Sequence, residues 1–382
     1  MRFKRVYLDN GASTKVDPKV LAAMLPYFTE KYANASAIHT FGQESSNALE
    51  KARKIIAKSI NAKTSEIIFT SGGTESNNFA IKGLAFQNKR GHIITSKIEH
   101  KCILQSCKWL ESQGFKITYL DVDKEGFVNT EDLKKAIKPD TFLVSIIHGN
   151  NEIGTIQNIS KLGKICNENN VLFHTDACQS YTKTEIDVRK QNIDLMTLNS
   201  HKIHGPKGVG ALFIRDGIKI TPWQHGGGHE RNLRAGTENV HGVVGFAEAV
   251  KIASNKHVEY MTKLRDKLIL GALKIKGSKL NGLEKDRLCN NVNLSFSGVE
   301  GEALGGYLDA KNICSSAGSA CSSKSLEPSY VLKAIGLSNE EANSSVRLTL
   351  SKFNTEGEID YVLKVLPKVI DKLRSFSAIW KE

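Results

Sequence analysis

Two apolar strands, each followed by polar side chains, lie in residues 171–208, which read VLFHTDACQSYTKTEIDVRKQNIDLMTLNSHKIHGPKG. The first strand ends in Asp176, and the second leads into Lys202. Ligand sites of open α/β sheets gather at the carboxyl ends of the strands. A lysine in this position is a candidate for covalent attachment of an aldehyde. We therefore expect Asp176 and Lys202 to share one site, although each could also be structural, as a helix cap or a solvated strand end.

Similar short runs recur around this stretch and alternate with helical patterns. The runs are residues 67–70, 93–95, 117–120, 142–147, 171–173, 195–198 and 209–214. Strands that are almost continuously apolar and separated by helices indicate a mainly parallel sheet covered on both faces. The length of 382 residues favours two domains.

The pattern changes after residue 240. One long helix is expected over residues 240–275, followed by strands at 291–296 and 345–350 and a last helix over 355–374. We therefore predict two domains. They are a large α/β domain over residues 16–255 and a small α+β domain over residues 256–382, on which residues 1–15 pack.

A third feature is the turn Thr70-Ser71-Gly72-Gly73-Thr74, which follows a predicted strand and opens a helix. Free amides and the helix dipole favour a phosphate at such a point, although a simple capped turn is equally compatible. The lysine and spacing of a P-loop are missing. A phosphate cradle, a carboxylate and a lysine together are what pyridoxal 5'-phosphate requires. The sequence thus predicts a site for that cofactor.

The composition is that of a globular protein, with 40% hydrophobic and 24% charged residues. No apolar run is long enough to cross a bilayer, and the basic N-terminus lacks the apolar segment of a secretory signal. A cytoplasmic protein is therefore expected. The 53 basic and 40 acidic residues give a net charge of +13. The lysines are scattered, which argues against direct binding of nucleic acid.

Seven cysteines form no C-x-x-C pair, which argues against a disulfide framework or a structural zinc site. They are Cys102, Cys107, Cys166, Cys178, Cys289, Cys314 and Cys321. Most are expected to be small buried side chains. Cys321 differs, because it lies in a run of glycine, serine and alanine that predicts a loop.

Ordered motifs from Tyr7 to about Arg374 resemble the cysteine desulfurases of the NifS/IscS type, which are class V, fold-type I pyridoxal phosphate enzymes. The motifs are GTESN at 73–77, EH at 99–100, NNEIG at 150–154, DACQ at 176–179, SHK at 200–202, HGGGHE at 225–230, RAGTEN at 234–239, GSAC at 318–321 and LEPSY at 326–330. The resemblance implies the fold-type I architecture, with a mainly parallel central sheet in a large domain and a smaller C-terminal α+β domain.

The resemblance also implies roles for individual residues. Lys202 would hold the cofactor's aldehyde and later shuttle the Cα proton, and His100 would stack on the cofactor ring and act in acid–base steps. Asp176 would pair with the pyridine nitrogen. Arg347 would bind the substrate carboxylate, for which a planar bidentate donor is suited. The other expected cofactor ligands are Gly73, Thr74, Asn151, Gln179, Asn199, Ser200, His201 and Thr237.

Some of these ligands have further implications. Asn151 would contact the substrate as well as the cofactor. Thr237 would reach the phosphate of the other subunit, so the resemblance implies a homodimer. Asn199 stands where many relatives have a phosphate-binding serine, which makes Asn199 and Ser200 weaker candidates than His201.

The expected activity depends on Cys321. Its thiolate would attack the sulfur of bound L-cysteine, so that L-alanine leaves and Cys321 carries a persulfide. An iron–sulfur scaffold protein or a tRNA-thiolation protein would then accept the sulfur. No resident metal and no membrane are expected, although Cys321 would transiently share an iron–sulfur cluster with a scaffold.

Three alternatives stay open. A selenocysteine lyase or an aminotransferase could use Asp176 and Lys202 on the same fold, but an aminotransferase has no use for the thiol of Cys321. A non-catalytic scaffold of a sulfur pathway is the alternative from another class. Absorbance near 420 nm after addition of the cofactor would argue against such a scaffold.

Overall fold

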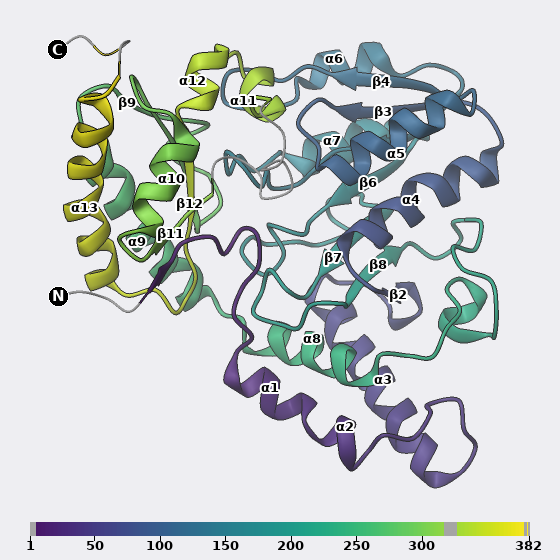
Figure 1. Ribbon diagram of the computed structural model, residues 1–382. Coiled ribbons are helices and arrows are strands. Elements are labelled where there is room, and N and C mark those ends of the chain that lie inside the picture. Colours follow the sequence, from purple (N-terminus) through teal and green to yellow (C-terminus); the bar gives the residue numbers. More distant parts are fainter. Residues whose placement is uncertain (1–4, 317–326, 378–379, 381–382) are drawn as a thin grey trace.

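The computed structural model describes residues 5–316, 327–377 and 380, and its larger part is built on a seven-stranded sheet with the order β2-β8-β7-β6-β5-β3-β4 (Figure 1). The strands are β2 (Ile67–Thr70), β3 (His92–Ser96), β4 (Lys116–Leu120), β5 (Thr141–Ser145), β6 (Leu172–Asp176), β7 (Leu195–Asn199) and β8 (Gly210–Ile214). Within this sheet β8 pairs antiparallel with both of its neighbours, and the other pairs are parallel. The prediction of a mainly parallel sheet is confirmed.

Helices cover both faces of this sheet. They are α1 (Pro18–Met24), α2 (Pro26–Thr29), α3 (Thr40–Ser59), α4 (Gly73–Asn88), α5 (Lys101–Ser112), α6 (Thr130–Ala136), α7 (Ile159–Glu168) and α8 (Val240–Ile252), with 3₁₀ turns η1 (Thr64–Glu66) and η2 (His229–Asn232). Phe79 of α4 shares one core with Leu212 of β8. Ile56 of α3 shares the opposite core with Phe213. Consecutive strand residues thus face different cores, as the pleat requires.

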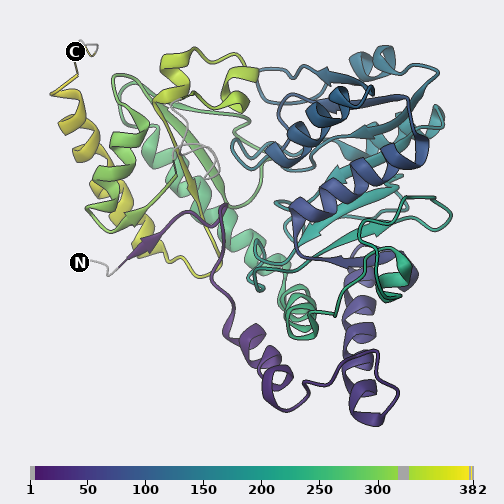
Figure 2. The same ribbon diagram turned by 45° about the vertical axis from the view of Figure 1, so that its right-hand side comes forward.

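A second, three-stranded sheet has the order β12-β10-β9 and lies on the left of Figure 1. Its strands are the antiparallel β9 (Ser278–Leu280), β10 (Asn291–Phe296) and β12 (Ser345–Thr349), and nearby β1 (Val6–Tyr7) pairs in parallel with β11 (Ile313–Cys314). The helices are α9 (Asn255–Ala272), α10 (Gly301–Asp309), α11 (Tyr330–Ala334), α12 (Asn339–Asn343) and α13 (Glu356–Arg374). Residues of α9, α10, α13, β10 and β12 form a core of their own. Figure 2 shows α13 on the outer side of this part.

The prediction of one helix over residues 240–275 is wrong. Helix α8 ends at Ile252 and α9 begins at Asn255, because Ser254 has an extended backbone with φ −153° and ψ 154°. The two helices also belong to different cores, since α8 packs beneath the large sheet and α9 packs with the small one. The chain has to turn between them.

Candidate active site

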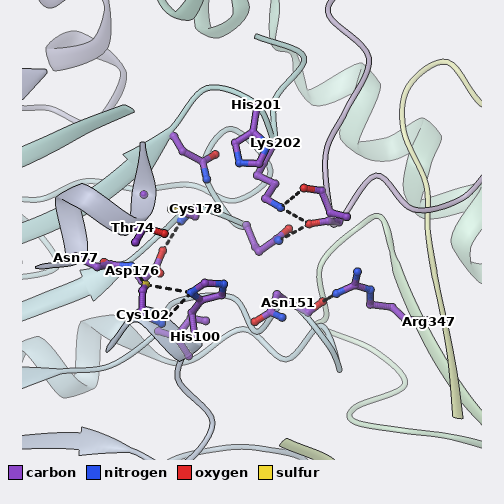
Figure 3. A pocket seen from close by; sticks show the side chains of 16 residues that line it. Thr74, Asn77, His100, Cys102, Asn151, Asp176, Cys178, His201, Lys202 and Arg347 are labelled. Atoms are coloured by element: carbon purple, nitrogen blue, oxygen red, sulfur yellow. Dashed lines mark hydrogen bonds between the residues drawn. The ribbon is translucent and has the colours of Figure 1, made fainter. Parts of the chain in front are cut away.

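A cavity of about 270 Å³ lies beside the carboxyl ends of β6 and β7 (Figure 3). Most of the predicted site residues line it, namely Gly73, Thr74, His100, Asn151, Asp176, Gln179, Asn199, His201, Lys202 and Arg347. Ser200 is buried behind the lining residues, and Thr237 is exposed away from it. Cys321 lies outside the described residues.

The cavity has six further lining residues, which are Gly11, Ala12, Asn77, Ile147, Cys102 and Cys178. Cys178 is part of the DACQ motif at residues 176–179. Asn77 stands one helical turn after Gly73 and therefore faces the same way, a signal that the helical period could have supplied. The positions of Gly11 and Ala12 have no such local signal.

Asp176 is the last residue of β6 and is 4% exposed. Its carboxylate accepts hydrogen bonds from Asn77 Nδ2 at 2.6 Å and from the backbone N–H of Cys178 at 2.9 Å. These two donors fix the plane of the carboxylate. A rigid carboxylate at a strand end can hold a protonated ring nitrogen in one orientation.

Lys202 follows β7, the strand that pairs in parallel with β6. Its Nζ donates to the backbone oxygens of Gly11 and Ala12, the latter at 2.7 Å. Burial, followed by the nearby positive charge of Arg347, lowers the pKa of Lys202 to about 8. An amine with this pKa has a substantial neutral fraction near neutral pH and can act as a nucleophile or a base.

The segment that receives Lys202 is the N-terminal strap, defined here as residues 9–13. It also accepts a hydrogen bond from Gln179 Nε2 on Gly11 O at 3.0 Å, and the hydroxyl of Ser13 lies 3.3 Å from His201 Nδ1. Burial and the charge of Lys202 lower the pKa of His201 to about 4. The strap thus contacts several residues that follow the strands β6 and β7.

His100 precedes α5 and accepts a hydrogen bond from the backbone N–H of Cys102 on Nδ1 at 3.3 Å. The thiol of Cys102 lies 3.0 Å from the same nitrogen, as Figure 3 shows. Because Nδ1 accepts, the proton of the neutral imidazole resides on Nε2. The neighbouring Glu99 is fully buried, and burial raises its pKa to about 8.

Helix α4 begins at the turn for which a phosphate cradle is predicted. Helix α4 begins at Gly73 after Gly72, and no side chain caps its first amides. A Cβ on Gly73 would lie 2.6 Å from Cys178 Sγ, so glycine is required by this close approach. The uncapped amides at the start of a 16-residue helix form an anion site.

Five buried polar atoms of the lining residues and of Ser200 have no hydrogen-bond partner among the described residues. They are Asn77 Oδ1, Asn151 Oδ1, Asn199 Oδ1, Ser200 Oγ and Arg347 Nε. Buried polar groups are normally paired, and leaving them unpaired is unfavourable. Together with the carboxylate, the amine and the free helix amides, they fit a polar ligand with the groups of pyridoxal phosphate.

Residues on either side of segment 317–326 bond to the lining residue Arg347 and to Glu152 and Glu99, which are the sequence neighbours of the lining residues Asn151 and His100. The backbone N–H of Ser316 donates to Arg347 O at 3.1 Å. After the segment, Ser329 Oγ donates to Glu152 Oε2 at 2.5 Å and Tyr330 OH donates to Glu99 O at 2.7 Å. Ser316, Ser329 and Tyr330 are therefore bonded to a lining residue or to a sequence neighbour of one.

Known proteins resemble this chain over nearly its full length. The family described as Aminotransferase class-V matches residues 6–362. A protein from Methanosarcina thermophila named Cysteine desulfurase IscS is 52% identical over 381 residues, which cover 98% of this chain and 94% of that protein. A second protein of that name, from Dictyoglomus turgidum, is 51% identical over 385 residues, which cover 99% of this chain and 98% of that protein.

Solved structures agree with these relatives. One titled NifS-like protein superposes with a TM-score of 0.91 at 39% identity, covering 96% of this chain and 100% of that one. Another, titled SspA in complex with cysteine, has a TM-score of 0.83 at 40% identity, and the match covers 92% of this chain and 100% of that one. The chain therefore belongs to the class-V aminotransferase family and, within it, to the cysteine desulfurases.

Proposed function

We propose that the cavity beside β6 and β7 is where this enzyme, a pyridoxal phosphate-dependent cysteine desulfurase, removes sulfur from L-cysteine. One observation carries the assignment of the site. Asp176 and Lys202, which follow neighbouring parallel strands, line a single cavity together with the uncapped start of α4. These are the three groups that the cofactor needs.

When bound, pyridoxal phosphate supplies an aldehyde that combines with amines and a ring that accepts electrons. In our proposal Lys202 holds the aldehyde and Asp176 keeps a proton on the ring nitrogen. His100 covers the ring. The remaining ligands proposed for the ring oxygen and the phosphate are Gly73, Thr74, Asn151, Gln179, Asn199, Ser200 and His201.

The substrate is bound and deprotonated by residues on opposite sides of the cavity. Arg347 binds the carboxylate of L-cysteine. Once free, Nζ of Lys202 takes the Cα proton, and a pKa of about 8 supports this role because the neutral amine is then well populated. His100 has its proton on Nε2 and can give it to a leaving group.

Cys321 remains the proposed nucleophile on the basis of the family resemblance. The bonds of Ser316 to Arg347 and of Tyr330 to Glu99 support this proposal, because described residues before and after Cys321 in the sequence are tied to a lining residue and to the neighbour of another. The thiolate forms an S–S bond with the substrate sulfur as the C–S bond breaks. The Cβ carbon then gains a proton and Lys202 returns a proton to Cα, so that L-alanine and a Cys321 persulfide result.

The test is mass spectrometry of the protein after incubation with L-cysteine. The expected result is one added sulfur on the peptide that contains Cys321, which Cys321→Ala and Lys202→Ala abolish and the control Cys314→Ser preserves. Full release of sulfide by Cys321→Ala would refute the persulfide step. Turnover of L-selenocysteine without turnover of L-cysteine would favour the selenocysteine lyase instead.

We further propose a homodimer in which Thr237 reaches the cofactor of the partner. Large apolar side chains are exposed on α1, α2 and the loop that follows, which suits an interface between copies. They are Leu21, Leu25, Phe28, Tyr32 and Ile38, with exposed fractions of 49%, 55%, 50%, 67% and 95%. Analytical ultracentrifugation of wild type and Phe28→Asp tests this, since a wild-type monomer would contradict the proposal.

The domain division into residues 16–255 and 256–382 also remains a proposal. It is supported by the core around β10 and β12, which combines Val6 and Leu8 with side chains from 264–370. A cytoplasmic location is supported by the six described cysteines, all of which are free thiols. The net charge of +13 suits an acidic sulfur acceptor, such as an iron–sulfur scaffold or a tRNA-thiolation protein.

A further inference from the structure

Arg347 is a buried cation whose hydrogen bonds are only partly used. Its side chain is 2% exposed and comes from β12, an edge strand of the small sheet. NH1 donates to Asn151 O at 3.0 Å, and NH2 donates to Asp9 Oδ1 at 3.0 Å. A guanidinium has five N–H donors, and here Nε is buried without a partner. The side chain is thus held by two groups and still has donors to offer.

Asp9 reaches Arg347 because the N-terminal strap is hydrogen-bonded along β12. Asp9 forms a parallel bridge with Thr349. Asn10 Nδ2 donates to Thr349 O at 2.8 Å, and the backbone N–H of Gly11 donates to Thr349 Oγ1 at 2.6 Å. The backbone N–H of Thr349 also donates to Leu8 O, so the chain is held on both sides of Asp9 and its carboxylate is presented to the guanidinium by a rigid element.

The two contacts of Arg347 come from different parts of the fold. Asn151 belongs to the loop after β5 in the large sheet, whereas Asp9 belongs to the strap. A long, flexible side chain that is fixed at both terminal nitrogens can no longer rotate about its last bonds. A carboxylate ligand that meets such a side chain does not have to order it first, which favours binding.

We propose that Asp9 is a positioning residue that holds Arg347 in the orientation needed to bind the substrate carboxylate. Asp9 does not contact the substrate. It satisfies one N–H of NH2 and neutralises the buried cation when no substrate is present, which leaves Nε and the remaining N–H groups directed to the ligand. This inference rests on the proposed binding of L-cysteine by Arg347.

The test compares Asp9→Ala with Asp9→Asn in the cofactor-loaded enzyme. Asp9→Ala removes the acceptor, and we expect the KM for L-cysteine to rise about tenfold, with kcat within about twofold of wild type. Asp9→Asn keeps an oxygen that can accept the same N–H, so its KM should stay within about threefold of wild type. Tyr7→Phe is the matched control, because it removes the hydrogen bond from Tyr7 OH to Ser13 O in the strap and leaves the hydrogen bonds of Arg347 in place.

Two ligands that differ only in the carboxylate separate positioning from general damage. L-Alanine and ethylamine are titrated into each variant, and the cofactor absorbance reports binding. Asp9→Ala should weaken L-alanine about tenfold and leave ethylamine unchanged. In an Arg347→Gln background, Asp9→Ala should have no further effect on L-alanine.

Each other outcome has a definite meaning. A lower KM in Asp9→Ala would show that Asp9 occupies the place of the substrate carboxylate, and this would overturn the inference. An equal loss of affinity for L-alanine and ethylamine in Asp9→Ala would overturn it as well. So would a loss of affinity for L-alanine that Asp9→Ala still causes in the Arg347→Gln background, because Asp9 would then act through the strap alone. If wild type itself does not consume L-cysteine, the proposed function fails and not the positioning role.

Discussion

Replacing Gly73 with alanine tests whether the close packing of α4 against β6 shapes the cofactor site. The new Cβ would lie 2.6 Å from Cys178 Sγ, about 1 Å inside ordinary contact distance. The backbone of Cys178 is held by the bond from its N–H to Asp176 Oδ1 at 2.9 Å, so the contact can be relieved only by rotating Sγ or by shifting α4. Overpacking of this kind costs about 1–3 kcal/mol. We expect Gly73→Ala to lower the free energy of unfolding by about 2 kcal/mol.

The same substitution should be tolerated once the sulfur is removed. Cys178→Ala alone should destabilise the protein by about 1 kcal/mol, because it deletes one small buried group. In that background Gly73→Ala should cost less than about 0.5 kcal/mol, so the coupling energy between the two sites is about 1.5 kcal/mol. Urea unfolding of the apoprotein, monitored by circular dichroism, gives the free energy of unfolding of wild type, of the two single variants and of the double variant. The comparison requires that the four proteins have equal m-values.

A neighbouring glycine supplies the control. Gly72 has φ 152° and nothing within 4 Å of its added Cβ, so Gly72→Ala introduces backbone strain without a clash. The change that Gly72→Ala causes in the free energy of unfolding should be the same in wild type and in the Cys178→Ala background. If Gly73→Ala were equally destabilising in both backgrounds, the contact between α4 and the DAC motif would not be what requires glycine, and the reasoning would be refuted.

Three further predictions concern buried charges. The rate at which the apoprotein captures pyridoxal phosphate should rise with pH through about 8, because burial lowers the pKa of Lys202 to that value. Stopped-flow absorbance measures this rate, and a rate that does not change around pH 8 would contradict the prediction. Burial raises the pKa of Glu99 from 4.5 to about 8, so Glu99 keeps its proton in the folded state between these two values. The free energy of unfolding of wild type should therefore fall as pH rises through that window. Glu99→Gln should remove this pH dependence in urea titrations, and an unchanged pH dependence would refute the assignment. Glu230→Ala leaves the buried Arg53 without its 2.7 Å partner and should cost about 3–5 kcal/mol of unfolding free energy, whereas a loss below about 1 kcal/mol would show that water reaches the cation.

Local patterns predict the large sheet well. The β-branched run at residues 67–70 coincides with β2, and the run at 195–198 falls within β7. These strands are buried on both faces, so their apolar residues are continuous and easy to recognise. The break between α8 and α9 could not be predicted in the same way, because the helical spacing continues across Ser254 while the two helices pack in different cores.

The candidate site also contains residues that local patterns predict and residues that they do not. Asp176 and Lys202 were predictable because each follows its own strand and parallel strands end at one edge. The contacts of Gly11 with Lys202 and of Asp9 with Arg347 join residues that are far apart in sequence, so no local sequence pattern predicts them. Cys102 was missed as a neighbour of His100, because a cysteine on a half-buried helix has the same pattern as a core residue.

The N-terminal strap has a consequence for how the protein is made. It leaves the ribosome before its partner Lys202, and Arg347 and Thr349 follow later still. The wall of the cavity is therefore assembled from residues that are synthesised at widely separated times, and such distant pairings form slowly. Coenzyme capture has to wait until Arg347 and Thr349 have been made, so a nascent chain cannot begin chemistry before these residues are in place.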